Sequence, residues 1–168
     1  NAVAKVQQAV LPTDVTPGAY VLGTDTVVAL GSRVLGKPST AEEAAGMLRS
    51  LSGRRHQVVS GVALARGTSE WPPRMVAAHQ GGKGKLEGLR AAVAVTDVTF
   101  LSLSEGDIQS YLALGEWKGK AGAYAIQGSA GLFVTAIRGE YSNVVGLPLC
   151  LLARMFRESG FDLLGGNW

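Results

Sequence analysis

Hydrophobic positions along the chain follow two spacings, one typical of strands and one typical of helices. Residues 20–30, YVLGTDTVVAL, are apolar with a few small and polar interruptions, which predicts a strand. Gly31 and Ser32 follow, and a glycine at the first position of a two-residue loop is what a type II′ turn requires. The pattern therefore predicts a hairpin in which Leu30 pairs with Arg33.

Helices are indicated where apolar residues recur at helical spacing behind a capping residue. Thr40 with Glu43 three residues later forms a capping-box signature, and the apolar run behind it ends at Gly53. Ser104 has the character of a second N-cap, with Gly115 at the far end of its helix. Two further helices are expected, at residues 2–10 and 147–159.

Three later runs rich in β-branched residues predict strands at 55–65, 92–103 and 131–139. Because helices alternate with strands and one connection is a hairpin, we expect an α/β fold with a mixed, twisted sheet and flanking helices. Residues 66–92 are rich in Gly, Pro, Arg and Lys with little periodicity, so they are interpreted as a surface insertion. A single domain over 1–168 is expected.

The length and composition indicate a globular protein without a membrane span. The 168 residues suffice to bury a core without disulfides, and no apolar run approaches the roughly 18 residues of a membrane span. We therefore expect a protein of the cytoplasm, with no membrane partner. The one cysteine, Cys150, lies in an apolar run and is expected to be a buried helical thiol.

The net charge is small. A formal charge of +3, spread along the chain, suits an anionic ligand such as a nucleotide and does not imply nucleic acid. Binding of nucleic acid through the basic residues of 66–92 is a weaker alternative, because few aromatic residues interleave with them.

Asp25 is the unusual residue of the first hairpin, because an ionised carboxylate in an apolar strand is costly unless it is paired or binds a cation. The predicted register places Lys37 opposite Thr26, next to Asp25. One interpretation is a plain ion pair between Asp25 and Lys37. The other is a phosphate site, since Lys37 stands just before a capped helix, with Asp25 able to hold a divalent cation or activate water.

A second cluster spans 115–128, GEWKGKAGAYAIQG, where glycine and alanine allow backbone to come close to a ligand. Gln127 offers both a donor and an acceptor, the complement of a nucleobase edge. A tight solvated loop is the alternative interpretation.

These segments together resemble the Maf family of nucleotide pyrophosphatases. The resemblance lies in GTDTVVALGSRVLGKP, AEEAAGMLRSLSGRRHQVVSGVAL, LSEGDIQSYLALGEWKGKAGAYAIQG and GLFVTAIRGEYSNVVGLPL, and covers nearly the whole chain outside 66–92. It implies hydrolysis of a nucleoside triphosphate to the monophosphate and pyrophosphate, with a divalent cation such as Mg²⁺ or Mn²⁺. It also implies an α/β fold related to inosine triphosphate pyrophosphatases.

The resemblance also assigns residues by position. Asp25 matches the family's proton acceptor and would also hold the metal, while Thr26 and Gln127 match positions that set specificity. The pairing of Asp-Thr here with Ile-Gln-Gly at 126–128 is similar to the branch acting on dTTP and UTP. A methyl-GTP branch carries other residues at these places and is the alternative.

Three lysines match phosphate-end positions of the family, and two departures accompany them. Lys5 and Lys37 match lysines that line the phosphates, and Lys120 matches the lysine of an Asp-Lys-Ala-Gly motif. Gly119 replaces the aspartate of that motif, and the Ser-x-Ser-Pro-Arg-Arg loop with which the family opens does not precede Asn1. Either the sequence starts after that loop, with coding sequence upstream of Asn1, or the chain is a natural truncation.

The departures keep a rival open, a nucleotide-binding or regulatory module that retains the pocket without turnover. A homodimer is also considered, because the resemblance leaves the oligomeric state undecided.

Overall fold

The computed structural model describes residues 2–9, 19–67 and 86–165. Its contacts divide the chain into two compact units. Unit 1 comprises Asn1–Asp25, Gly61–Val93 and Leu151–Trp168, and unit 2 comprises Thr26–Ser60 and Ala94–Cys150.

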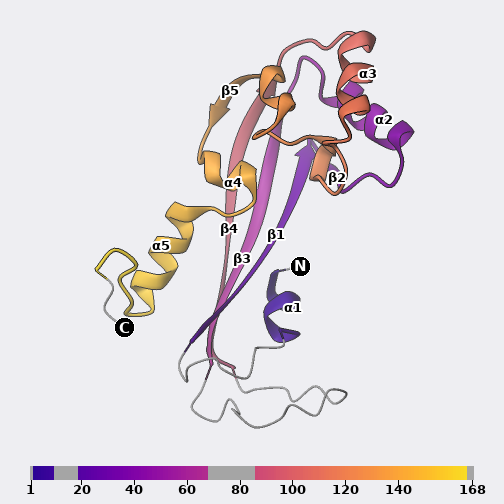
Figure 1. Ribbon diagram of the computed structural model, residues 1–168. Coiled ribbons are helices and arrows are strands. Elements are labelled where there is room, and N and C mark those ends of the chain that lie inside the picture. The colour runs from indigo at the N-terminus through magenta and orange to yellow at the C-terminus, as the bar shows by residue number, and fades with distance from the viewer. Residues whose placement is uncertain (1, 10–18, 68–85, 166–168) are drawn as a thin grey trace. The chain divides into compact units, whose positions relative to one another are not determined.

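Five strands and five α-helices make up the described chain (Figure 1). The strands are β1 (Tyr20–Leu30), β2 (Arg33–Leu35), β3 (Arg55–Gly67), β4 (Leu86–Phe100) and β5 (Val134–Arg138). The helices are α1 (Ala2–Gln7), α2 (Ala41–Leu51), α3 (Glu105–Leu114), α4 (Tyr141–Val145) and α5 (Leu149–Glu158), with 3₁₀ turns η1 (Ala121–Ala123) and η2 (Ser129–Phe133). The α/β fold with flanking helices is confirmed, as predicted from the alternation of strand and helix patterns along the sequence.

The sheet has the strand order β2-β1-β3-β4-β5, and its outer pairs, β1 with β2 and β4 with β5, are antiparallel. Leu30 pairs with Arg33 as predicted, and Gly31 has a φ of 59°. This positive φ is what the first loop position of a II′ turn requires, so the hairpin prediction is confirmed.

Both predicted helix caps are present in unit 2. The Thr40 hydroxyl accepts the Glu43 N–H at 3.1 Å, and the Glu43 carboxylate reaches the backbone N–H of Ser39 at 2.7 Å. Ser104 and Asp107 form a full capping box at the start of α3. These caps satisfy N–H groups that the first helical turn leaves without intrahelical partners.

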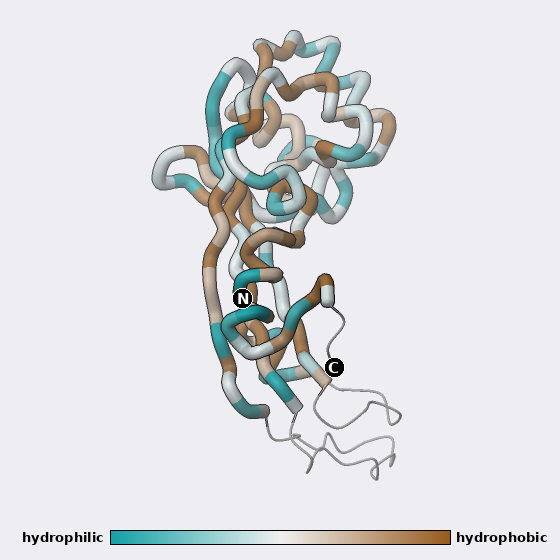
Figure 2. The backbone as a smooth tube through the Cα atoms, turned by 90° about the vertical axis from the view of Figure 1, so that its left-hand side faces the viewer, coloured by the Kyte–Doolittle hydropathy of each residue, from teal (hydrophilic) through white to brown (hydrophobic). Residues whose placement is uncertain are grey.

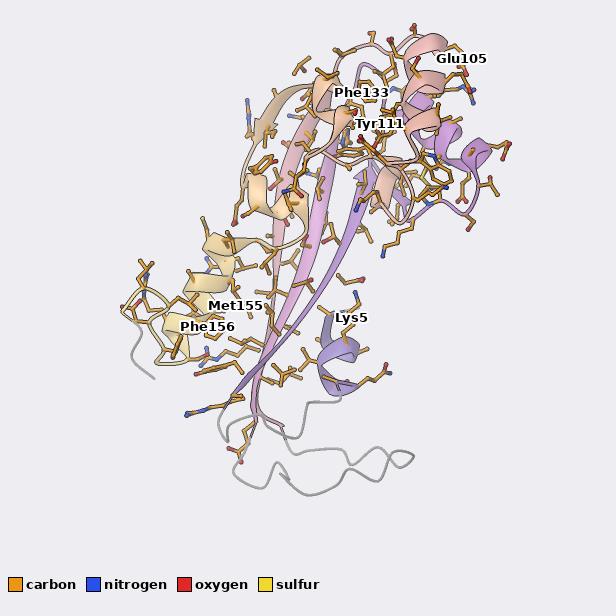
Figure 3. All side chains as sticks on the ribbon, viewed as in Figure 1. Lys5, Glu105, Tyr111, Phe133, Met155 and Phe156 are labelled. Atoms are coloured by element: carbon orange, nitrogen blue, oxygen red, sulfur yellow. The ribbon has the colours of Figure 1, made fainter. Side chains whose placement is uncertain are left out.

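The core of unit 2 is built on aromatic rings between the sheet and helices α2 and α3. Phe100 meets Tyr124 edge-on with ring centroids 4.8 Å apart, and Tyr111 meets Phe133 at 5.3 Å (Figure 3). Burying rings of this size in T-shaped contacts contributes about 0.5–1.5 kcal/mol per pair beyond the hydrophobic term. This core fixes the backbone from which the 115–128 loop extends.

Unit 1 has a smaller core, made where α1 packs on β1 through residues without bulk. A Cβ on Gly23 would lie 2.5 Å from the carbonyl oxygen of Ala2 and 2.7 Å from Cγ2 of Val6, so the close approach requires glycine. Val21, Ala63 and Ala65 complete the buried residues of this cluster. Hydrophobic and polar residues alternate along much of the backbone, as Figure 2 shows by colour.

Helix α5 buries Leu151, Leu152, Met155 and Phe156, of which the last two are labelled in Figure 3. Cys150 is exposed, so the expectation of a buried thiol is wrong. At 100° per residue, position 150 falls opposite the midpoint of the buried face, which an apolar run read without its phase does not reveal.

Two features of the chain were not anticipated. Helix α4 has no side-chain cap at Glu140, which is why no start signal marks it. The ends of the expected 66–92 insertion are strand residues, since β3 continues to Gly67 and β4 starts at Leu86, while 68–85 lie outside the described residues. Among the helices of the described ranges, none is long and apolar enough to cross a membrane.

Candidate active site

The six candidate residues divide between the two units. Lys5 and Asp25 belong to unit 1. Thr26, Lys37, Lys120 and Gln127 belong to unit 2.

In unit 1, the Lys5 ammonium pairs with the Asp25 carboxylate. Lys5 Nζ lies 2.8 Å from Oδ1 of Asp25 and 2.7 Å from the carbonyl oxygen of Thr24. The pairing follows from the packing at Gly23, because Gly23 and Asp25 share one face of β1 and α1 lies against that face. Figure 3 labels Lys5 on α1.

The pair keeps Asp25 ionised. The hydrogen bond from Lys5 lowers the pKa of Asp25 below its ordinary value of 3.8, and the small desolvation works in the opposite direction. The Asp25 side chain is 37% exposed, so the carboxylate reaches solvent. A carboxylate that is charged at neutral pH and accessible can accept a proton from water or bind a cation.

The lysine that pairs with Asp25 in the structure is thus Lys5, whereas the hairpin register had pointed to Lys37. Strand β2 ends at Leu35, so the ladder stops before Lys37. Pro38 follows, and a proline in the next position favours departure from the ladder because it cannot donate a backbone hydrogen bond. Lys37 is exposed in the connection to α2.

In unit 2, a backbone hydrogen bond joins the segment of Lys37 to that of Lys120. The N–H of Gly122 donates to the carbonyl oxygen of Gly36 at 2.9 Å. Gly122 has a φ of 68°, and a Cβ there would lie 2.8 Å from Cγ2 of Val28. Both the left-handed backbone and the lack of space therefore require glycine. The segments that carry the two exposed ammonium groups are therefore held side by side.

Gly119, which replaces the aspartate of the family motif, also has a left-handed backbone, with φ at 70°. Glycine adopts this conformation without strain, while aspartate does so less readily. A Cβ at this position would meet no atom within 4 Å. The substitution therefore favours the turn and removes a carboxylate, without opening or filling a packed site.

Unit 2 also contains a pocket of about 340 Å³ beside these lysines. Its polar lining comes from Glu116, Lys120 and Gln127. Its apolar lining comes from Tyr124, Ala125, Ile126, Val144 and Val145. A cavity of this size that combines apolar side chains with a few convergent polar groups is typical of a small-molecule site.

Gln127 is exposed at the pocket, and its side-chain amide makes no hydrogen bond within the described part of the chain. Both faces of the amide are therefore available to a ligand.

Thr26 begins a buried polar network that the sequence did not reveal. Its hydroxyl lies 2.8 Å from that of Ser60, and Asn143, which is fully buried, donates to Val58 O and to the hydroxyl of Thr96, both at 3.0 Å. Thr96 in turn bonds the backbone of Glu140 just before α4. The network thus ties β3 and β4 to the helix whose Val144 and Val145 line the pocket.

His56 has a structural role in the core of unit 2. It is 2% exposed, its Nε2 lies 3.0 Å from the Tyr124 hydroxyl, and desolvation lowers its pKa to about 4. The ring is therefore neutral at pH 7 and packs edge-on against Phe100. His79 lies outside the described residues.

No group of three or more His, Cys, Asp or Glu residues in the described ranges could hold a metal ion unaided. Mg²⁺ bound to a nucleotide needs only one or two carboxylates, since phosphates and water complete its shell. Asp25, ionised and partly exposed, fits that requirement as a single protein ligand.

Residues 1–159 match the family described as Maf-like protein. The chain belongs to the Maf family. The dTTP/UTP pyrophosphatase of Anaeromyxobacter dehalogenans is 46% identical over 147 residues, covering 88% of this chain and 68% of that protein. The enzyme of the same name from Pelotomaculum thermopropionicum is 47% identical over 146 residues, covering 87% and 68%.

A third relative of that name, from Rhizobium johnstonii, is 44% identical over 161 residues, which are 95% of this chain and 69% of its own. The resemblance to the Maf family and to its dTTP/UTP branch is confirmed. Family membership covers residues from both units, since the match extends from 1 to 159.

Proposed function

We propose that this Maf protein hydrolyses dTTP and UTP to the monophosphate and pyrophosphate. The relatives named dTTP/UTP pyrophosphatase support the reaction and the substrate class. The structural observation that carries the proposal is the pocket of unit 2, where Gln127 and Lys120 line one cavity. An amide suits a nucleobase edge, and an ammonium suits a phosphate.

Asp25 is the proton acceptor of the proposal. Water attacks the α-phosphorus, the bond from that phosphorus to the bridging oxygen breaks, and the water proton passes to the Asp25 carboxylate. The hydrogen bond from Lys5 supports this role because it lowers the pKa of Asp25 and keeps the base unprotonated at neutral pH.

Lys37 and Lys120 stabilise the charge that develops on the leaving pyrophosphate. The hydrogen bond between Gly36 and Gly122 supports this assignment, since it keeps their two exposed segments together. Lys5 would serve the same end of the substrate, with its ammonium shared with Asp25.

Gln127 reads the base, with Thr26 as the second specificity position. Uracil and thymine present a carbonyl oxygen beside an N–H, so one amide can donate to the first and accept from the second. Cytosine presents an amine and a bare ring nitrogen there. A buried mismatch costs about 1–3 kcal/mol for each group left unsatisfied, which predicts at least about tenfold preference for UTP over CTP.

A divalent cation, Mg²⁺ or Mn²⁺, would neutralise phosphate charge when bound with the nucleotide, with Asp25 as its protein ligand. We place the protein in the cytoplasm because nucleoside triphosphates are made and used there. The described residues carry no argument for a second copy of the chain, so a homodimer is not part of the proposal.

The test is to follow the products of UTP and dTTP by ³¹P NMR. We expect monophosphate and pyrophosphate in equal amounts. Nucleoside diphosphate with orthophosphate would contradict the assigned bond cleavage. Tight nucleotide binding without products would support the impaired module, for which Gly119 is the favouring observation, and a preference for a methylated guanine nucleotide would support the other branch of the family.

A further inference from the structure

Glu116 holds the segment that carries Gln127. Its Oε2 accepts the backbone N–H of Ser129 at 2.8 Å, and its Oε1 accepts the Ser129 hydroxyl at 2.8 Å. Both carboxylate oxygens thus bind one residue, two positions after Gln127. Bonds to an ionised acceptor are about twice as strong as neutral ones.

Gly128 shows how closely the carboxylate lies against this segment. A Cβ there would be 2.2 Å from Oε2 of Glu116, so any side chain at position 128 would displace the Glu116 carboxylate. Gly128 and Glu116 both line the pocket with Gln127. The carboxylate is therefore a wall of the pocket and a support of its loop.

A second anchor lies on the other side of Gln127. The Tyr111 hydroxyl accepts the backbone N–H of Ala125 at 3.0 Å, and its ring is fixed in the core against Phe133. Gln127 therefore stands midway between a support at 125 and a support at 129. Since its amide makes no hydrogen bond of its own within the described chain, these backbone anchors set the position from which the amide extends.

We propose that Glu116 is a positioning residue for base selection: by clamping Ser129 it places the Gln127 amide, and so sets the preference for uracil and thymine over cytosine. This role rests on the proposed function. In this role Glu116 does not contact the nucleotide.

The test measures kcat/KM for pyrophosphate release from UTP and from CTP in the full chain. Glu116→Ala removes the clamp. Glu116→Gln keeps an acceptor for the Ser129 N–H and a donor for its hydroxyl, but loses the charge. Ser129→Ala removes the hydroxyl bond alone.

Asp107→Ala is the matched control. Asp107 accepts the backbone N–H of Ser104 at 2.8 Å and its hydroxyl at 2.7 Å, which is the same chemistry at the start of α3. Asp107 is not among the residues that line the pocket. Any general effect of removing such a clamp therefore appears in this variant too.

We expect Glu116→Ala to lower the UTP to CTP ratio about tenfold, mainly through a higher KM for UTP. Ser129→Ala should lower the ratio about threefold and Glu116→Gln by less, while Asp107→Ala leaves it unchanged. Hydrogen exchange at the Ser129 amide should be at least about tenfold faster in Glu116→Ala and unchanged in Asp107→Ala.

Three results would overturn the role. The first is a Glu116→Ala protein that keeps the parent ratio within about twofold, and the second is a Glu116→Gln protein as impaired as Glu116→Ala, which indicates direct charge recognition. If Glu116→Ala does not fold, an unchanged ratio in Ser129→Ala is the third. A parent that releases no pyrophosphate from UTP overturns the proposed function itself, which separates the two failures.

Discussion

Asp25 in unit 1 and Glu116 in unit 2 are both carboxylates, and the protein holds them in opposite ways. Asp25 is 37% exposed and is held by the Lys5 side chain, which is itself 56% exposed. Glu116 is half-buried, and its oxygens bind the backbone and hydroxyl of Ser129. One carboxylate is open to solvent and the other is built into a loop.

The difference matches the two tasks of a selective hydrolase. A proton acceptor has to meet water and change its charge, so it needs exposure and a partner that tunes its pKa. A positioning group has to keep its geometry, so it gains from fixed backbone donors. Substitution at Asp25 should therefore affect the rate for every nucleotide, and substitution around Glu116 should affect the choice between nucleotides.

The largest effect is expected for Asp25→Asn, which keeps the shape of the side chain and loses the charge. Turnover should fall by about two to four orders of magnitude on all substrates, the usual range for a lost general base. Asp97→Asn is the control, since Asp97 is also a strand carboxylate, paired with Arg55 at 3.8 Å. Turnover within about threefold of the parent would remove Asp25 from the chemistry.

Gln127→Leu should reduce the preference for UTP and dTTP over CTP. We expect the ratio of kcat/KM for UTP and dTTP over that for CTP to fall at least about tenfold, because only the preferred bases lose a matched pair. Gln109→Leu, at an exposed position of α3, serves as the control. An equal loss on all three nucleotides would place Gln127 outside base recognition.

Lys37→Met tests the phosphate end. Losing a charge-assisted bond to phosphate should weaken nucleotide affinity about five- to tenfold with little change in melting temperature. Titration calorimetry with a non-hydrolysable analogue measures the affinity. Lys118→Met is the control, since Lys118 is exposed and is not among the residues that line the pocket. Unchanged affinity would place Lys37 outside the phosphate site.

The smallest effect is a shift in pH dependence on Lys5→Met. Because the Lys5 hydrogen bond lowers the pKa of Asp25, its loss should raise that pKa and move the acidic limb of the kcat/KM profile to higher pH. The stability from the lowered pKa is present at neutral pH and is lost as pH falls through the folded-state pKa, so Lys5→Met should reduce that dependence. An unmoved limb would exclude Lys5 as the tuning partner.

Local signals in the sequence were enough for the elements of the fold. The Gly31-Ser32 loop predicts the register of β1 with β2, and the caps at Thr40 and Ser104 predict the starts of α2 and α3. Each of these is decided within a few residues of chain. Predicting which face of α5 is buried requires the phase of the helix, which an apolar run does not give. Cys150 was therefore predicted on the buried face, whereas it is exposed.

Partners distant in sequence were harder to predict. Lys5 meets Asp25, twenty residues along the chain, because α1 packs on Gly23, and the only hint was a small residue on the face of Asp25. The network of Thr26, Ser60 and Asn143 joins segments separated by more than thirty residues. Glu116 was passed over because a lone glutamate in a glycine-rich loop carries no signal until the chain folds back to Ser129.

The central claim is that this Maf protein selects uracil and thymine through Gln127. The most direct measurement is kcat/KM for pyrophosphate release from dTTP, UTP, CTP and GTP under the same conditions. We predict dTTP and UTP ahead of CTP by at least about tenfold, with little difference between the first two because one methyl group discriminates weakly. Equal rates on all pyrimidines, or a clear preference for a guanine nucleotide, would contradict the account.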